Sequence, residues 1–464
     1  MAEARPCARR ALVALAACAA ALAASRAEAE RVAVSSGAAS LQDALDAAAD
    51  GDALVLAPGT HAGPIVVRKR LTLEGEPGAW IEGPGRGSVV RIEAAGASMR
   101  NLGVRGSGTD LEAMDSGVFI ERTAIGARVE GSRLEGNLFG VYVHGAKNAV
   151  VAHNVIVGLR SGRMNEAGNG VSVWNAPGAE VTDNDMSFGR DGIFSISSSR
   201  NLFARNRFHD LRFAVHYMYT NDSEISDNVS TGNAVGYALM FSNRLVVRGN
   251  ASDHDRDQGF VFNYANGSQV SGNLAVGGPQ PIARWLSRGA RLDSEHGVGP
   301  ASDPEEASTA TRVGPEKCVF IYNSNQNRFR DNWFEGCEIG VHFTAGSEGN
   351  VMSGNAFVRN RNQVKYVGSR FLDWSQDGRG NYWSDNPGFD LNGDGIADTA
   401  FRPNDIVDKA LWTAPAAKIL LNSPAIQAIR WAQAQFPALL PGGVIDSKPL
   451  IAPPPKPKPR GPAS

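Results

Sequence analysis

Several features of common protein classes are missing from this sequence. After residue 29 the chain has no apolar run long enough to cross a bilayer as a helix. Its 46 Lys and Arg residues nearly balance 48 Asp and Glu residues, and a formal net charge of −2 gives no basic field for nucleic acid. Only four cysteines occur in 464 residues, and two of them, Cys7 and Cys18, lie in the first 20 residues. The sequence therefore predicts neither a membrane-spanning protein nor a nucleic-acid-binding protein.

The first 29 residues have the three parts of a secretory signal peptide. Arg9 and Arg10 are followed by an apolar stretch at 11–24, and Ala27-Glu28-Ala29 has the small-x-small spacing of a cleavage site. A lipoprotein signal ending before Cys18 is the alternative, but the apolar stretch continues past that cysteine. We therefore predict that residues 1–29 are removed and that the mature protein is located in the periplasm.

The central part of the chain consists of a repeat of roughly 22 residues. Each unit begins near a glycine, contains two short alternating strands separated by a turn, and closes on an asparagine. These asparagines are Asn154, Asn184, Asn206, Asn228, Asn250, Asn273, Asn332 and Asn355. Such a unit cannot bury its apolar side chains alone, but stacked units can, and the stack is a parallel β-helix. We predict that the asparagines form a ladder in which each amide binds the turn of the next coil.

The repeat defines the domain organisation. We predict an all-β protein with a β-helix over residues 30–373, interrupted by a long surface loop or disordered insertion at about 278–316. A helix beginning after Ser40 would cap the open end of the stack. Residues 374–450 form a C-terminal extension with an Asp-rich loop and a helix at Pro415–Gln435, which we expect to pack mainly on the stack. Residues 451–464 form a proline-rich tail that we expect to be disordered.

Strand alternation separates inward from outward side chains, and two outward columns result. One column is Tyr142, Ser172, Phe194, His216, Ala238, Val261, Phe320 and His342, and the other is His144, Trp174, Ile196, Met218, Met240, Asn263, Tyr322 and Thr344. These columns are more apolar than a solvated sheet face. We interpret His144, Trp174, Ile196, Met218 and Met240 as a surface covered by a partner or by another part of the chain. The alternative is that His216, Met218 and Met240 bind copper transiently, because imidazole and thioether groups suit Cu(I).

Cys318 and Cys337 are the two cysteines that remain after cleavage. They would be diagonal neighbours in adjacent coils, so a disulfide and a pair of thiols both remain open. Both share the alternation of the outward columns, which predicts that they face outward.

The segment DLNGDGIAD near the C-terminus has the spacing of a cation-binding loop. Asp390, Asn392 and Asp394 supply oxygen ligands at alternate positions before a glycine, and Asp398 follows. Phe401 stands where an EF-hand requires glutamate, so this is not an EF-hand. We predict a structural calcium site, and the alternative is a tight turn with solvated aspartates.

Several longer strings resemble one family. These strings are HYMYTNDSEISDN, NRLVVRGN, KCVFIYN, FEGCEIGVHFTAGSEGN, NYWSDNPGFDLNGDGIADTAFRPND and LLNSPAIQAIRWAQAQFPALLPGGVIDSKPL. In this order they resemble NosD proteins, periplasmic maturation factors of nitrous-oxide reductase, over most of the mature chain. The resemblance implies a right-handed β-helix that is docked on an ABC permease with a cytoplasmic ATPase. It implies that this protein itself is not an enzyme and helps to build the copper-sulfide site of apo nitrous-oxide reductase alongside a copper chaperone lipoprotein. Membrane association would be through the permease.

A carbohydrate-active β-helix enzyme, such as a lyase, hydrolase or epimerase, is the alternative from another class. Its candidate acid–base cluster is Asp253, His254, Asp255 and Asp257. These residues lie in a turn between coils, where charged side chains are expected in any case.

Overall fold

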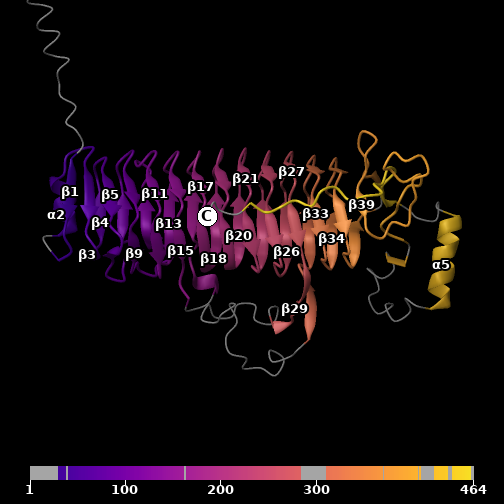
Figure 1. Cartoon of the computed structure of the whole chain (residues 1–464), viewed down its shortest axis with the longest axis horizontal. Helices are drawn as coiled ribbons and strands as arrows, with labels where there is room; N and C mark the ends of the chain where they lie inside the picture. Colours follow the sequence, from indigo (N-terminus) through magenta and orange to yellow (C-terminus); the bar gives the residue numbers. More distant parts are fainter. Residues whose placement is uncertain are drawn as a thin grey trace, which may run out of the picture.

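The chain winds into a long parallel β-helix, as Figure 1 shows. This computed structural model describes residues 30–37, 40–160, 164–283, 310–368, 370–405, 407–408, 423–436 and 442–460. The predicted signal peptide and most of the predicted insertion lie outside these residues. The expected all-β class and the parallel β-helix are confirmed. Among the described residues, no helix combines the length and apolarity required to cross a bilayer.

Three rows of parallel strands, which we call faces A, B and C, form the walls of the β-helix. Face A contains β1 (Arg31–Val34), β2 (Ala53–Leu56), β5 (Thr72–Gly75), β8 (Ser98–Arg100), β11 (Arg128–Glu130), β14 (Val150–Ala152), β17 (Glu180–Thr182), β19 (Leu202–Ala204), β21 (Glu224–Ser226), β24 (Val246–Arg248), β27 (Gln269–Ser271), β32 (Arg328–Arg330) and β35 (Val351–Ser353). Two long strands, β18 (Asp185–Ile196) and β20 (Arg207–Met218), run through both of the other faces and join them into one sheet.

The remaining strands of that sheet belong to either face B or face C. Face B contains β3 (Gly59–Ala62), β6 (Ala79–Glu82), β9 (Gly103–Arg105), β12 (Arg133–Glu135), β15 (Val155–Val157), β22 (Val229–Thr231), β25 (Ala251–Asp253), β28 (Leu274–Val276), β33 (Trp333–Glu335), β36 (Ala356–Val358) and β39 (Tyr382–Trp383). Face C contains β4 (Ile65–Val67), β7 (Val90–Ile92), β10 (Ser116–Ile120), β13 (Phe139–His144), β16 (Val171–Trp174), β23 (Val235–Met240), β26 (Gln258–Asn263), β31 (Lys317–Tyr322), β34 (Ile339–Thr344) and β37 (Asn362–Val367).

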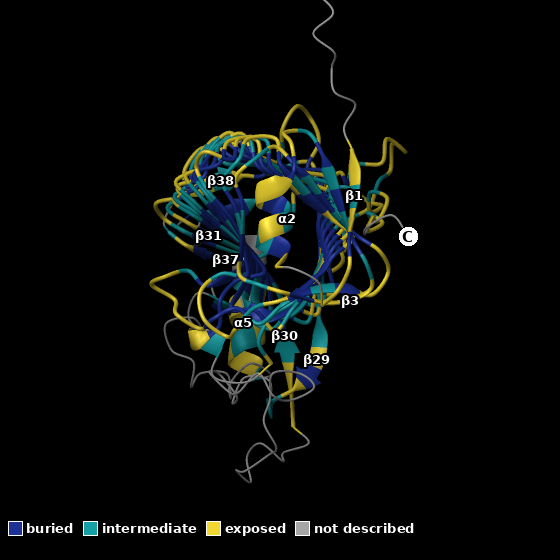
Figure 2. Cartoon of the chain, turned by 90° about the vertical axis from the view of Figure 1, so that its left-hand side faces the viewer, coloured by how far each residue is buried: buried dark blue, intermediate teal, exposed yellow. Residues whose placement is uncertain are grey.

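A single buried core fills the β-helix along its length. The residues assigned inward on face C by alternation are buried, including Tyr217, Leu239 and Phe262, each 0% exposed. Figure 2, viewed along the stack, shows the buried side chains gathered on the inner walls. Because no single coil can enclose these side chains, each coil depends on its neighbours for burial.

The predicted asparagine ladder runs along the corner between faces A and B. The backbone N–H of Asn206 donates to Oδ1 of Asn228 at 2.9 Å, and Asn228 donates in the same way to Asn250 at 3.1 Å. Each of these amide groups also donates to a carbonyl of the preceding coil, as Asn228 Nδ2 does to Phe203 O at 2.8 Å. The ladder ends at Asn381, whose N–H donates to the buried carboxylate of Asp446 at 2.7 Å. It therefore ties the C-terminal extension to the last coil.

The two ends of the stack are closed differently. At the N-terminal end, α2 (Leu41–Ala47) is capped by Ser40 and buries Leu41 and Leu45 over the open coil, as predicted (Figure 2). At the other end, α5 (Pro424–Gln435) lies beyond the last coil in Figure 1. The expectation that this helix packs mainly on the stack is wrong for its described residues, because Ile429 and Trp431 are 44% and 67% exposed. Its apolar residues are not arranged in one stripe that a neighbouring face could cover.

The C-terminal segments return to the stack after α5. Strand β40 (Gly443–Ile445) pairs with β38 (Phe371–Asp373), and residues 451–460 then run back along the stack from β39 (Figure 1). Lys456 Nζ lies 2.5 Å from Glu335 Oε2 and 5.4 Å from the ring centre of Trp333 on face B. Residues 451–460 thus follow an extended course on the β-helix, where the composition predicts a disordered tail.

The insertion begins and ends as a two-stranded antiparallel ribbon, β29 (Gly278–Pro281) with β30 (Thr311–Gly314). Just after it, Cys318 and Cys337 form a disulfide with their Cα atoms 5.7 Å apart. The prediction that they face outward is wrong, since both are 0% exposed. Cys318 pairs in position with Gly259 and Gly340, where the chain turns from face B into face C and two successive residues point inward. Strict alternation does not extend into this corner.

The ladder generates a prediction about stability. Replacing Asn228 with Ala removes hydrogen bonds to two neighbouring coils and leaves buried polar groups unpaired, each costing roughly 1–3 kcal/mol. We expect Asn228→Ala to lower the free energy of unfolding by about 3 kcal/mol. Asn243→Ala is the matched control, because Asn243 makes the same type of coil-to-coil bond in a half-buried row where water can replace it. Equal losses in denaturant unfolding of the two variants would contradict a special role of the ladder.

Candidate functional site

The outer surface of face C is the candidate site, and its strand register reproduces both predicted columns. Tyr142, Ser172, Phe194, His216, Ala238, Val261, Phe320 and His342 are successive strand partners. His144, Trp174, Ile196, Met218, Met240, Asn263 and Tyr322 are likewise successive partners. The five predicted docking residues therefore form one unbroken row, which we call the soft row: His144, Trp174, Ile196, Met218 and Met240.

The soft row is partly exposed, and its side chains touch from coil to coil. His144 stacks on Trp174 with ring centres 4.6 Å apart and planes 8° apart. Met218 is the direct strand partner of Met240, and both are partly exposed. His216 lies two residues before Met218 on the same face of β20 and is only 7% exposed. The three predicted copper ligands thus share one surface of two adjacent coils.

Polar atoms without partners are concentrated on this face. Eight buried side-chain nitrogen or oxygen atoms of the described residues have no hydrogen-bond partner. Four of them belong to the two outward columns: Nδ1 of His144, Nε2 of His216, Oδ1 of Asn263 and Nδ1 of His342. Because buried polar groups are nearly always paired, such a concentration indicates a surface completed by something outside the chain.

His342 shows how the face suppresses charge. Burial, together with the nearby cations of Lys365 and Lys317, lowers the pKa of His342 to about 4. Its imidazole is therefore neutral at neutral pH. The outward columns consequently carry little charge of their own.

A buried ionic group lies beneath the first column. The carboxylate of Asp191 is 0% exposed and accepts hydrogen bonds from Arg212 Nε at 2.8 Å and Nη2 at 2.7 Å. His216 Nδ1 lies 3.0 Å from Oδ2 of the same carboxylate. Burial opposes ionisation of Asp191, but the hydrogen bonds from His216 and Arg212 outweigh it and hold its pKa below the ordinary value. Neither Asp191 nor Arg212 was singled out from the sequence. Their only sequence signal is charge at positions leading into an otherwise apolar strand.

An aromatic ridge borders the soft row at the turns between faces C and A. We give this name to Tyr219, Phe241, Tyr264 and Tyr322; Tyr219 stacks on Phe241 and Phe241 on Tyr264, with ring centres 5.1 Å apart in both pairs. Tyr219, Tyr264 and Tyr322 are at least 40% exposed.

Three ridge residues occupy backbone positions that aromatic residues rarely take. Tyr219, Phe241 and Tyr264 have φ angles of 51°, 50° and 52°, in the left-handed region. In neighbouring coils the same position is held by Gly145, Asn175, Ser197 and Asn323, which are smaller. Left-handed φ at bulky residues costs free energy and is often associated with function. Sequence analysis missed this ridge because a left-handed turn position cannot be recognised before the coils are aligned.

The Asp-rich loop folds around its first residue. Asp390 Oδ1 and Oδ2 accept hydrogen bonds from the N–H groups of Gly393 at 2.7 Å and Gly395 at 2.8 Å. Gly395 O accepts from Ile451 N, so the loop fastens the start of the tail. Across the described residues, no three His, Cys, Asp or Glu side chains converge in a way that could hold a metal ion. Calcium binding therefore stays a prediction.

The four residues of the alternative acid–base cluster are not assembled into one site. Asp255 is 0% exposed and accepts hydrogen bonds from Ser230 and Ser252 inside the turn. Asp253 pairs with His254 at 2.6 Å, and Asp257 binds Arg256. The most buried of these carboxylates therefore has a structural role in the turn.

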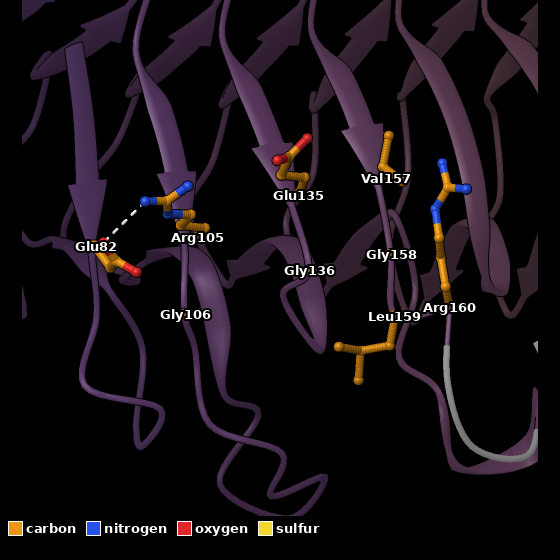
Figure 3. A pocket seen from close by; sticks show the side chains of 9 residues that line it. All are labelled: Glu82, Arg105, Gly106, Glu135, Gly136, Val157, Gly158, Leu159 and Arg160. Atoms are coloured by element: carbon orange, nitrogen blue, oxygen red, sulfur yellow. Dashed lines mark hydrogen bonds and ion pairs between the residues drawn. The ribbon is translucent and has the colours of Figure 1, made fainter. Parts of the chain in front are cut away.

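A groove of about 810 Å³ lies elsewhere, on the outside of face B near the N-terminal coils (Figure 3). Arg105 and Glu82 form an ion pair there at 3.0 Å, and Glu135 and Arg160 also line the groove. None of the residues predicted for a site lies in it.

The fold has a counterpart among solved structures. The A-module of the mannuronan C-5 epimerase AlgE6 from Azotobacter vinelandii superimposes with a TM-score of 0.50 at 15% identity, covering 70% of this chain and 89% of that one. This likeness is to a β-helix architecture alone.

Sequence comparisons identify the family. Residues 158–388 match the family described as periplasmic copper-binding protein (NosD). A relative from Stutzerimonas stutzeri, named a probable ABC transporter binding protein NosD, is 40% identical over 85% of this chain and 86% of its own length. A protein of the same name from Pseudomonas aeruginosa is 38% identical over 88% of this chain and 90% of its own. The description of the family as periplasmic confirms the location predicted from the signal peptide. On the strength of these matches, the chain belongs to the NosD family.

Proposed function

We propose that this protein is the periplasmic subunit of an ABC-transporter complex that assembles the copper-sulfide site of nitrous-oxide reductase. The observation that carries the proposal is the outer surface of face C, where thioethers, aromatic rings and unpartnered imidazole nitrogens gather on adjacent coils. Soft ligands of this kind suit copper(I). The family description as copper-binding and the relatives' names as transporter binding proteins support the same role.

In this proposal copper is cargo, and His216, Met218 and Met240 are its transient ligands. The unpartnered Nε2 of His216 and the neighbouring thioethers on the same face fit a weakly hydrated soft cation. The protein itself is not an enzyme, and ATP hydrolysis by the cytoplasmic partner supplies the energy. A carbohydrate-active role receives no support from Asp255, which is occupied inside its turn.

The soft row and the aromatic ridge together form the docking platform for apo nitrous-oxide reductase and the copper chaperone lipoprotein. Aromatic and methionine side chains are enriched at the centres of protein interfaces. At the far end of the stack, α5 exposes Ile429 and Trp431 and would contact the permease, through which the protein associates with the membrane.

The decisive experiment is deletion of the gene in the native host, followed by purification of the reductase. We expect a reductase without its catalytic copper cluster, judged by copper content and visible spectrum. Wild type should restore the cluster. Met218→Leu/Met240→Leu, which keeps apolar volume but removes both thioethers, should restore it poorly. Ile196→Leu is the control in the same row, without a donor atom. A fully assembled reductase in the deletion strain would overturn the proposal.

The ridge can be tested separately from copper. Tyr219→Asn/Phe241→Asn/Tyr264→Asn relieves left-handed strain and loses ring stacking, two opposing effects of about 1 kcal/mol per residue. We therefore expect little change in melting temperature. We expect binding to the soluble chaperone domain or to apo reductase to weaken by roughly 30-fold or more, as for other interface hot spots. Ser197→Asn, in the same turn position one coil earlier, should bind normally. Unchanged binding of the triple variant would remove the ridge from the interface.

For the Asp-rich loop we propose a structural calcium ion held by Asp390, Asn392, Asp394 and Asp398. The support is the spacing of oxygen donors before a glycine that has a φ of 83° at Gly395. We expect calcium to raise the melting temperature relative to chelator, and Asp394→Ala to abolish that difference. No difference for the wild type would leave a calcium-independent turn stabilised by Asp390.

A further inference from the structure

The Asp191–Arg212–His216 group deepens the proposed function, because it controls which nitrogen of His216 can bind a metal. Asp191 lies on β18, and Arg212 and His216 lie on the adjacent strand β20. Arg212 uses two nitrogens to clamp both carboxylate oxygens of Asp191. The carboxylate is therefore fixed in orientation before His216 contacts it.

The chemistry of the carboxylate determines the tautomer of His216. An ionised carboxylate can only accept hydrogen bonds, so the contact of 3.0 Å requires a proton on Nδ1 of His216. In a neutral imidazole, Nε2 then carries the lone pair. That Nε2 atom is buried and has no hydrogen-bond partner. Its lone pair is thus left for another ligand.

The ring of His216 is also held in place by its apolar neighbours. Its centre lies 4.9 Å from that of Phe194 and 5.0 Å from that of Phe213, nearly perpendicular to the latter. The guanidinium of Arg212 lies 4.3 Å from the ring centre of Phe213, so the clamp and the aromatic contacts form one packed unit. Alternative ring orientations would break the bond to Asp191.

We propose that Asp191 and Arg212 are positioning residues, which present the Nε2 lone pair of His216 to copper(I) beside Met218 and Met240. This inference rests on the proposed copper-handling function. Metal-binding histidines commonly donate their second ring nitrogen to a carboxylate, which fixes the tautomer and the ring orientation. Copper(I) binding at a nitrogen that carries no proton releases no proton, and the bond to Asp191 persists in the loaded state.

A second ion pair provides a matched control. Asp183 and Arg205 lie on neighbouring coils and form the same two-nitrogen clamp, at 2.8 and 2.7 Å, without a contact to histidine. Its loss should affect local stability as the loss of the Asp191 clamp does. Any effect on His216 or on copper should be specific to Asp191.

The test combines tautomer and affinity measurements on the mature protein. Long-range ¹H–¹⁵N spectra of histidine-labelled protein report the tautomer, and His216→Gln identifies the signal. Anaerobic competition with bicinchoninate measures copper(I) affinity. In Asp191→Asn the amide oxygen faces Arg212 and the NH₂ group faces His216, which moves the proton from Nδ1 to Nε2. We expect this variant to bind copper(I) ~10- to 100-fold more weakly, and Asp183→Asn to match wild type in both measurements.

The outcomes separate this inference from the proposed function. A wild-type His216 with its proton on Nε2 overturns the inference, and that measurement requires no variant to fold. Wild-type affinity in a folded Asp191→Asn protein also overturns it, while copper handling by the face stands. If wild type binds no copper(I), or if Met218→Leu/Met240→Leu binds it unchanged, the copper role of these residues fails and the inference fails with it.

Discussion

The stacking of one coil on the next is the constraint on which the rest of this structure depends. Backbone hydrogen bonds between coils set a spacing of about 4.8 Å along the stack. No coil has enough apolar residues to enclose its own interior, so every inward side chain is buried by residues of adjacent coils. The asparagine ladder extends this dependence to the corner, where each amide satisfies backbone groups of both neighbours. Asp446 ends the ladder and attaches the C-terminal extension to it.

The same stacking produces the candidate site. A residue at one outward position is repeated in space at every coil, so side chains 22 residues apart become direct neighbours. Met218 and Met240 are joined in this way, and so are His144 and Trp174, whose positions differ because a short outgrowth lies between them. A flat face built from such columns has no deep cleft. This suits contact with another protein better than enclosure of a small substrate.

Three departures from ordinary packing coincide on this side of the β-helix. Imidazole nitrogens are buried without partners, aromatic residues occupy left-handed turn positions, and a carboxylate is fully buried under the outer column. Each costs stability in the isolated chain. Their concentration between Asp191 and His342 distinguishes face C from face A, where outward residues form ordinary exposed ion pairs such as that of Glu224 and Arg248.

Much of the fold follows from the sequence because its period is visible in the sequence. The recurring Asn and the alternation of strands determine the β-helix, the ladder, the N-terminal capping helix and the two outward columns, since all are local patterns repeated at fixed spacing. Only the tertiary structure decides what happens where the period is broken. The corner between faces B and C turns Cys318 and Cys337 inward, and α5 projects from the end of the stack. The clamp of Asp191 by Arg212 also belongs to this group, because its geometry depends on two strands meeting in a register that no single segment specifies.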